Sequence, residues 1–462
     1  MAQWQVPQYN NQREANNFAG GLNSGTPVFD LTDNESSEEY GFDTDQFPAL
    51  SVRKGRTTYG STGSAQTNLL ANFKDTHMVR AVGTALQYDN AGVWTAITGT
   101  FADVDWDATN FNGKLIMTNG TDNVKVWNGS ALSDLNAVSA PKGKYITNDT
   151  VRVWIAKDDI LYYSAYLAET DWTTAENSGS VQYYTERGGF ITGLKNFANH
   201  ICVFKKDSFA EIFGKDYFSF KLIENSNDIG CVSHKTIQEV GDTLFWLGQT
   251  DVYAYKGGKP VKIGQKIRKQ LNSINQAQIS KCWGGTDGIR YYLGLVTGAN
   301  TQPDTLCIYD PRYGTWRVHS ISGTFRYATY FGGAFYVGDS AGLTYKMNDG
   351  TTDAGTAISW AVTSKAFNEG MPEAEKEYFE MHLQVYLPTG STMTVAVSTD
   401  DDSATFTTVQ TLTAASDTQS VNIIVPLDTV PLANWLRYKL SGTGPATIYN
   451  VERYFRVQPV QI

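Results

Sequence analysis

The sequence is poor in residue types on which whole classes of protein depend. Its 462 residues include four cysteines, Cys202, Cys231, Cys282 and Cys307. They lie too far apart for a local zinc site, and we interpret them as small buried residues of a protein made in a reducing cytosol. No apolar run reaches the roughly 20 residues of a membrane span, and the first residues lack a signal-peptide pattern. We therefore expect no membrane association and no structural disulfides.

Basic residues are also in the minority. Lysine and arginine number 37 against 47 aspartates and glutamates, which gives a formal net charge of -10. Proteins that grip the phosphates of DNA need a surplus of positive charge. The balance therefore argues against tight, general nucleic-acid binding and favours an acidic, soluble surface.

Recognisable catalytic motifs are missing as well. The five histidines (positions 77, 200, 234, 319 and 382) are scattered, and there is no HExxH, Gly-x-Ser-x-Gly or phosphate-loop motif. A propeller glycosidase would need two converging carboxylates, for which the candidates are Asp105, Asp287 and Asp310. A sialidase-type glycosidase would also need converging arginines. The candidates for these, in strand-like stretches of three units, are Arg152, Arg290 and Arg326. Turn chemistry and cross-strand pairing explain both sets, so we predict no enzyme, no catalytic residues, no cofactor and no metal.

One acidic run leaves a binding alternative open. Three adjacent carboxylates, Asp400, Asp401 and Asp402, offer the oxygen ligands that Ca²⁺ prefers. Their spacing does not match an EF-hand loop, and Asp side chains commonly cap the backbone donors of a turn. We interpret the run as a solvated hairpin tip.

What the chain has in abundance is aromatic residues and glycine. Aromatics make up 13% of it, and 42 glycines punctuate the sequence, a mixture typical of many short strands. Between residues 77 and 350 an apolar strand, a tight turn and a second alternating strand recur about every 40 residues. The units cover residues 77–98, 111–130, 144–172, 188–220, a fifth from 234, 279–318 and 324–347. The repeat predicts a β-propeller of about seven blades over residues 61–352, with six or eight as alternatives.

Several features accompany the repeat. Apolar residues at helical spacing predict a helix over residues 263–274, with a basic face or rim formed by Lys262, Lys266, Arg268 and Lys269. Large aromatics at similar places in their units are expected to fill the cores between blades, namely Trp94, Trp127 and Trp316. Strands with regular turns over residues 353–462 predict a β-sandwich of immunoglobulin size. The fold class is therefore all-β.

Residues 1–60 differ from the rest. They are polar and lack strand or helix periodicity until about residue 50, so we expect an extended N-terminal arm and a first strand, ordered against a neighbouring chain. The arm carries a Gly-Gly-Leu-Asn piece, then Asp-Asn-Glu, then Arg-Lys-Gly. We single out as interaction candidates Phe18, Gly20, Gly21, Leu22, Asn23, Asp33, Glu35 and Arg53.

The order of these pieces, followed by the repeats and by KEYFEMHLQV (376–385) and VAVSTD (395–400), resembles the tail-tube nozzle and neck propeller proteins of short-tailed bacteriophages. The resemblance covers most of the chain. It implies a structural virion protein, made in the host cytoplasm, that forms a ring of typically six copies. The implied partners are further copies of the chain and the neighbouring portal, adaptor and tail proteins. Genomic DNA would pass through the ring without specific binding, helped by an acidic lumen.

Two other functions remain open at this point. One is a carbohydrate-binding, receptor-recognising tail component, which requires exposed aromatics gathered on one face of the propeller with polar partners. The other is the propeller glycosidase, which requires two carboxylates within about 5–10 Å of each other in a pocket.

Overall fold

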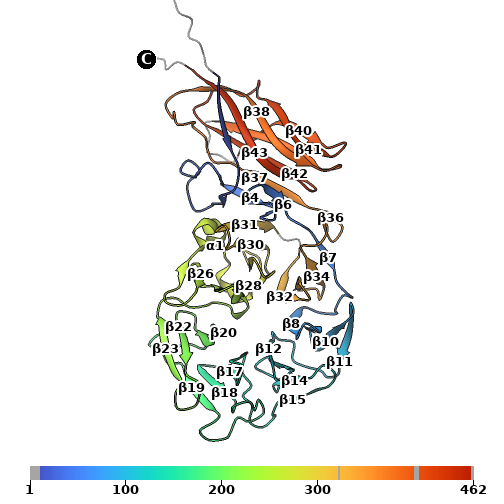
Figure 1. Ribbon diagram of the computed structural model, residues 1–462, viewed down its shortest axis with the longest axis vertical. Coiled ribbons are helices and arrows are strands. Elements are labelled where there is room, and N and C mark those ends of the chain that lie inside the picture. Colours follow the sequence, from blue (N-terminus) through green and yellow to red (C-terminus); the bar gives the residue numbers. More distant parts are fainter. Residues whose placement is uncertain (1–10, 321–322, 400–404, 459–462) are drawn as a thin grey trace, which may run out of the picture.

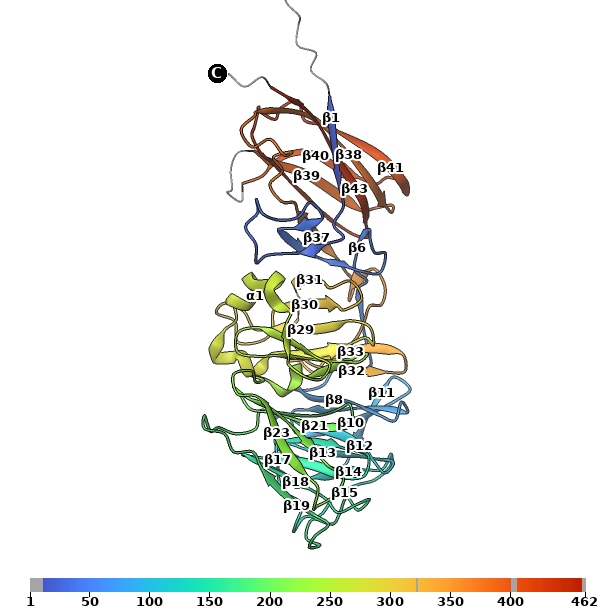
Figure 2. The same cartoon turned by 60° about the vertical axis from the view of Figure 1, so that its left-hand side comes forward.

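Short antiparallel strands arranged in a ring make up most of the molecule. The structure, a computed structural model, describes residues 11–320, 323–399 and 405–458. Seven blades surround one axis and form a β-propeller, with a two-sheet sandwich stacked on one edge of the ring (Figures 1 and 2). The predicted all-β class, propeller and sandwich are therefore confirmed, and the blade number is seven. Asp400, Asp401 and Asp402 lie outside the described residues.

Six of the blades are four-stranded sheets whose strands follow one another along the chain. Blade 1 contains β8 (Thr67–Phe73), β9 (His77–Val82), β10 (Ala85–Asn90) and β11 (Val93–Ile97). Blade 2 contains β12 (Asp107–Phe111), β13 (Lys114–Thr118), β14 (Lys125–Trp127) and β15 (Leu132–Asp134). Blade 3 contains β16 (Tyr145–Asn148), β17 (Val153–Lys157), β18 (Ile160–Tyr163) and β19 (Gly179–Gln182).

The next three blades repeat this plan. Blade 4 contains β20 (Gly193–Phe197), β21 (His200–Phe204), β22 (Phe209–Phe213) and β23 (Lys221–Ser226). Blade 5 contains β24 (Gln238–Val240), β25 (Thr243–Leu247), β26 (Val252–Tyr255) and β27 (Val261–Lys262). Blade 6 contains β28 (Trp283–Thr286), β29 (Tyr291–Leu295), β30 (Thr305–Asp310) and β31 (Thr315–Ser320). In each blade the first strand lies nearest the axis.

The seventh blade is assembled from both sides of the propeller sequence. Its inner strands are β32 (Phe325–Phe331), β33 (Ala334–Asp339) and β34 (Thr344–Met347), and β7 (Arg56–Thr58) pairs with β34 as the next strand. The short β35 (Thr352–Asp353) and β36 (Thr356–Ala357) extend this sheet. β32 packs beside β8 and closes the ring. The sheet of blade 7 therefore runs across both of the boundaries expected from the sequence, at residues 60/61 and 352/353.

A separate hydrophobic core fills each of the seven interfaces between neighbouring blades. Trp127 is buried between blades 1 and 2, Trp316 between blades 5 and 6, and Trp94 between blades 7 and 1. These large aromatic rings therefore fill the cores between blades, as predicted. Gly120 lies between β13 and β14, and Gly288 lies between β28 and β29; both have the positive φ angles, +78° and +89°, that tight turns commonly require.

Among the described residues, helical structure is confined to short segments. Residues expected to form one helix instead form the 3₁₀ turn η2 (Gly264–Ile267) and α1 (Arg268–Asn272), between blades 5 and 6. The other turns are η1 (His234–Thr236) and η3 (Gln276–Lys281). Ile267 and Leu271 are buried in the core of those blades, as the apolar spacing indicated, but the α-helical part is only five residues long.

The sandwich contains two sheets around a single core. One sheet has the order β41 (Thr418–Pro426), β38 (Lys376–Leu387), β43 (Thr447–Val457), β6 (Leu50–Val52) and β5 (Phe42–Asp43), and β1 (Gln12–Asn16) also pairs with β43. The other has the order β4 (Glu38–Tyr40), β37 (Ser359–Thr363), β42 (Leu436–Thr443), β39 (Thr392–Thr399) and β40 (Thr407–Thr413). A small parallel pair, β2 (Gly21–Leu22) and β3 (Glu35–Ser36), lies between sandwich and propeller.

The expectation of an extended arm that orders on a neighbouring chain is wrong for residues 11–58. These residues supply four strands to the sandwich and one to the propeller of their own chain. The strands are mostly two or three residues long, which is too short to show an alternating pattern. Isolated apolar anchors and ion pairs hold the segment in place, and neither leaves a periodic signal in the sequence.

Candidate functional site

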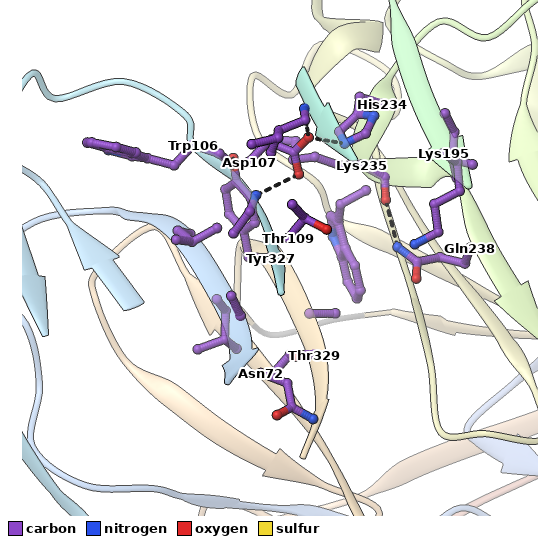
Figure 3. Close-up of a pocket in the computed structure, with 18 of the residues that line it drawn as sticks. Asn72, Trp106, Asp107, Thr109, Lys195, His234, Lys235, Gln238, Tyr327 and Thr329 are labelled. Atoms are coloured by element: carbon purple, nitrogen blue, oxygen red, sulfur yellow. Dashed lines mark hydrogen bonds and ion pairs between the residues drawn. The ribbon is translucent and has the colours of Figure 1, made fainter. Parts of the chain in front are cut away.

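Two cavities lie on the propeller axis. The first, here called the strand cavity, has a volume of about 270 Å³ and is lined by the innermost strands of the blades. The second, the mouth cavity, has a volume of about 460 Å³ and is lined largely by residues that precede those strands, among them Gln66, Lys144 and Ser280. Both cavities share a belt of side chains comprising Trp106, Asp107, His234, Lys235, Arg326 and Tyr327 (Figure 3).

Asp105 connects three blades through its carboxylate. It accepts contacts from Lys235 Nζ at 3.0 Å and from Arg326 Nη2 at 2.8 Å. Burial alone would raise the pKa of the Asp105 carboxyl, but the charges of Lys235 and Arg326, with hydrogen bonds from Lys235 and Tyr327, lower it. Burial, with Arg326 nearby, lowers the pKa of Lys235 although Asp105 opposes this. Lys235 also lies over the Tyr327 ring, 4.8 Å from its centre.

Asp107 and His234 form the second polar contact of the belt. His234 Nε2 lies 3.0 Å from Asp107 Oδ2, and the same oxygen accepts the Ile146 backbone N–H at 2.8 Å. His234 Nδ1 accepts the Leu194 N–H at 3.3 Å, so the ring proton is on Nε2 and is donated to Asp107. The Tyr145 ring packs against the imidazole at 4.6 Å between centroids. The pair therefore joins blades 2, 3, 4 and 5 around the axis.

The sequence did not single out the residues around the axis as a group. Asp105, His234 and Arg326 were considered separately, and Asp107, Lys195 and Lys235 were not considered. They come from different blades, and only the closure of the ring brings them together. No local spacing in the sequence carries that information.

The N-terminal motif residues lie elsewhere, at the joint between propeller and sandwich. Phe18 is buried in the sandwich core and Leu22 in the core between blades 5 and 6. Gly20 donates its N–H to the Asn34 carbonyl at 2.8 Å, and a side chain there would collide with Asn34 and Glu35. Gly21, with φ of +74°, lies against the edge of blade 6. This piece therefore connects two cores over a very short length of chain.

Four acidic residues of the segment, Asp33, Glu35, Glu38 and Glu39, have cationic partners in the same chain. Asp33 pairs with Lys365 of the sandwich at 2.8 Å. The propeller supplies the other partners, in the pairs Glu35–Lys266 at 3.0 Å, Glu38–Lys269 at 2.6 Å and Glu39–Arg317. Asn23 donates to Glu35 at 3.1 Å, and Arg53 forms a two-pronged contact with Asp353 at 2.9 and 2.5 Å. The basic rim predicted around residues 262–269 thus faces acidic residues, but those of its own chain.

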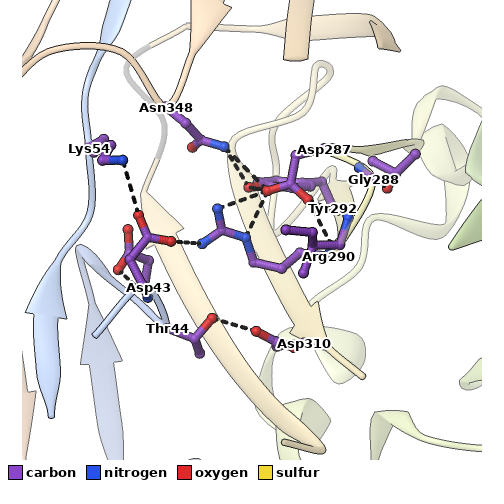
Figure 4. A network of polar contacts seen from close by, with 12 residues as sticks. Asp43, Thr44, Lys54, Asp287, Gly288, Arg290, Tyr292, Asp310 and Asn348 are labelled. Atoms are coloured by element: carbon purple, nitrogen blue, oxygen red, sulfur yellow. Dashed lines mark hydrogen bonds and ion pairs between the residues drawn. The ribbon is translucent and has the colours of Figure 1, made fainter. Parts of the chain in front are cut away.

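A second polar network fixes the segment to blade 6 (Figure 4). Arg290 contacts Asp45 at 3.1 Å and Asp287 at 2.8 Å. Thr44 donates to Asp310 at 2.6 Å, and Arg312 holds the same carboxylate. Asp287 and Asp310, two of the carboxylates considered for glycoside chemistry, are thereby engaged in the joint and in their own turns.

The remaining candidates have structural partners. Arg152 is buried in blade 3 and donates to the carbonyls of Ser164 and Asn177. His319 is buried among Arg53, Arg290 and Arg317, and burial together with their charges holds its pKa well below the usual value. The four cysteines are buried, as predicted, and are free thiols. Among the described residues no three His, Cys, Asp or Glu side chains are grouped to hold a metal ion, and no helix is long and apolar enough to cross a membrane.

Comparisons with known proteins yield structural likeness alone. No protein-family profile matches the chain, and no curated protein matches it in sequence. Virginiamycin B lyase from Staphylococcus aureus aligns with a TM-score of 0.46 at 9% identity, over 63% of this chain and 97% of the lyase. BamB from Moraxella catarrhalis aligns with a TM-score of 0.40 at 10% identity, over 68% and 96%. The computationally designed protein Ika8 aligns with a TM-score of 0.43 at 10% identity, over 63% and 99%. The chain is a seven-bladed propeller with an attached β-sandwich.

Proposed function

We propose that this chain is a structural, ring-forming component of a bacteriophage tail and not an enzyme. The observation that carries the proposal is the joint. The Gly-Gly-Leu-Asn and Asp-Asn-Glu pieces, on which the resemblance to nozzle proteins rests, build the connection between propeller and sandwich. A joint held by buried charge and by two cores keeps the modules in one orientation, as a load-carrying part of a tail requires.

The polar contacts around the axis support a non-catalytic role for the propeller. Asp105 is neutralised by Lys235 and Arg326, and Asp107 accepts hydrogen bonds from His234 and a backbone amide. A catalytic acid or base must be able to form a hydrogen bond with the substrate group whose proton it transfers. The carboxylates here are instead used to link blades, which is a structural role.

Ring formation is tested by the mass of the purified protein in solution. One chain has a mass of 51.0 kDa, so six copies have roughly 306 kDa. Mass photometry and negative-stain microscopy, alone and after mixing with phage tail proteins, are expected to show closed rings. A protein that stays monomeric under both conditions would contradict the proposal.

A carbohydrate-binding tail component is the second candidate, and one observation favours it. Exposed aromatic residues occur on loops of blades 3 and 4, and these blades lie away from the sandwich (Figure 1). They include Tyr166, next to Arg152, and the edge-to-face pair Tyr217 and Phe218. Such rings can stack on sugars. Specific binding to a glycan array, lost in Phe218→Ala with Tyr217→Ala, would promote this candidate over the ring.

A further inference from the structure

The axis of the propeller has a charge opposite to that of the whole chain. Two carboxylates, Asp105 and Asp107, line the two cavities. The cations that line them are Lys144, Lys195, Lys235, Lys281 and Arg326. In a protein with a formal net charge of -10, this surplus of positive charge is a local feature that needs an explanation.

Most of these cations already have partners. Lys235 and Arg326 share Asp105, and Lys281 donates to the Thr301 carbonyl at 2.8 Å. Lys144 is exposed at the mouth and lies over the Tyr145 ring. Among the residues that the structure describes, the side chains of Lys144 and Lys195 have neither an ion-pair partner nor a hydrogen-bond acceptor, and of these two only Lys195 lines the strand cavity. It is half-buried in the wall of the strand cavity.

The surroundings of Lys195 suit an anionic ligand. The side chain extends along the cavity wall toward Gln238 (Figure 3). The amide nitrogen of Gln238 is held by the carbonyls of Lys235 and Gly284, so this part of the wall is fixed. The hydroxyl groups of Thr109 and Thr329 line the same cavity and can donate to an oxyanion. The volume of about 270 Å³ admits a small molecule and excludes a nucleic-acid duplex.

We propose that the strand cavity binds a small molecule carrying a phosphate or carboxylate group, with Lys195 as the direct contact. Lys235 and Arg326 supply the positive potential behind it. A charge-assisted hydrogen bond from the ammonium group to the oxyanion neutralises the one cation of this wall that lacks a partner. The inference is independent of ring formation, since the cavity lies within a single chain.

The test is a titration of the purified full-length protein with inorganic phosphate and, in a separate arm, with acetate. Binding is followed by the thermal midpoint and by calorimetry, with sodium chloride at matched ionic strength as the reference. A saturable rise of the midpoint with one of the two anions is expected, and the arm that produces it identifies the class of ligand. Lys195→Gln is expected to weaken that binding about tenfold or more, the loss typical of a charged hydrogen bond.

Lys221→Gln is the matched control, because Lys221 is exposed on the outer strand of blade 4. It should bind the anion as the unaltered protein does. The proposal is wrong if neither anion raises the thermal midpoint more than chloride does. It is also wrong if Lys195→Gln and Lys221→Gln change the binding of the anion equally. Circular dichroism of both variants shows whether the fold is intact before the comparison is made.

Discussion

Phe18 and Leu22 are four positions apart in the chain, yet each is buried in the core of a different module. Phe18, 1% exposed, packs in the sandwich with Tyr438 at 6.2 Å between ring centroids. Leu22, also 1% exposed, packs among residues of blades 5 and 6. A connection this short fixes the distance between the modules.

Truncating either anchor is expected to destabilise the protein. Phe18→Ala should lower the free energy of unfolding by about 3–5 kcal/mol and Leu22→Ala by about 2–5 kcal/mol, because each leaves a cavity in a packed core. Denaturant unfolding measures both. Phe218→Ala, at a ring that is 76% exposed, should change the free energy of unfolding little. Equal effects at Phe218 and Phe18 would contradict the placement of Phe18.

The buried pair of Glu39 and Arg317 gives a second prediction. Both side chains are at most 2% exposed. Arg317→Met should therefore cost about 3–5 kcal/mol of stability by leaving a buried carboxylate without its partner. Replacing both residues by methionine should restore much of that loss. The exposed pair Lys256–Asp242 serves as the control, since its removal should have no measurable effect.

The strand that completes blade 7 can be removed by truncation. A chain that starts after Thr58 lacks β7 and the sandwich strands β1, β4, β5 and β6. We expect the loss of several kcal/mol and a fall of the melting temperature on the order of 10 °C or more. Hydrogen exchange should accelerate in β34, which loses its partner strand. A chain that starts at residue 11 keeps every one of these strands and should exchange like the full chain.

Asp105 makes the stability depend on acid pH. Its pKa is lowered in the folded protein from the ordinary 3.8. Its contribution to the free energy of unfolding is therefore present above about pH 4. The contribution is lost as the pH falls through the lower pKa that Asp105 has in the folded protein. Asp105→Asn should flatten the decline of the melting temperature below pH 4. At neutral pH the substitution should lower the free energy of unfolding by about 1–2 kcal/mol, because Lys235 and Arg326 lose their acceptor. The loss is modest because the carboxylate is partly exposed. An unchanged acid slope would show that Asp105 is not neutralised by them.

How far the sequence predicts the fold depends on how local each feature is. Alternating strands and turns such as Asn119-Gly120 are properties of neighbouring residues, so the blades and the sandwich strands could be predicted. Trp94, Trp127 and Trp316 were expected in the cores between blades and are found there. β8 was missed because its run of asparagine, leucine and alanine has no clear alternation.

The features that could not be predicted are those made by residues far apart in the chain. The N-terminal segment is held by pairs such as Asp33–Lys365, which are separated by 332 positions. On the propeller axis, Asp105 contacts Arg326, which lies 221 positions away in the sequence. The composition shows that the chain contains many acidic and basic residues. Which of them form pairs is decided only when the propeller ring closes.

The position of β7 bears on how the protein is made. Residues 56–58 leave the ribosome early, but their partners at residues 345–347 follow almost 290 residues later. The sandwich likewise pairs β1 with β43, so it too stays incomplete until residues 447–457 have been made. Neither module can be completed during synthesis in the usual order of one domain after another. A product of premature termination lacks a closed propeller and a finished sandwich alike, and its unpaired strands distinguish it from the full-length chain before any larger structure is built.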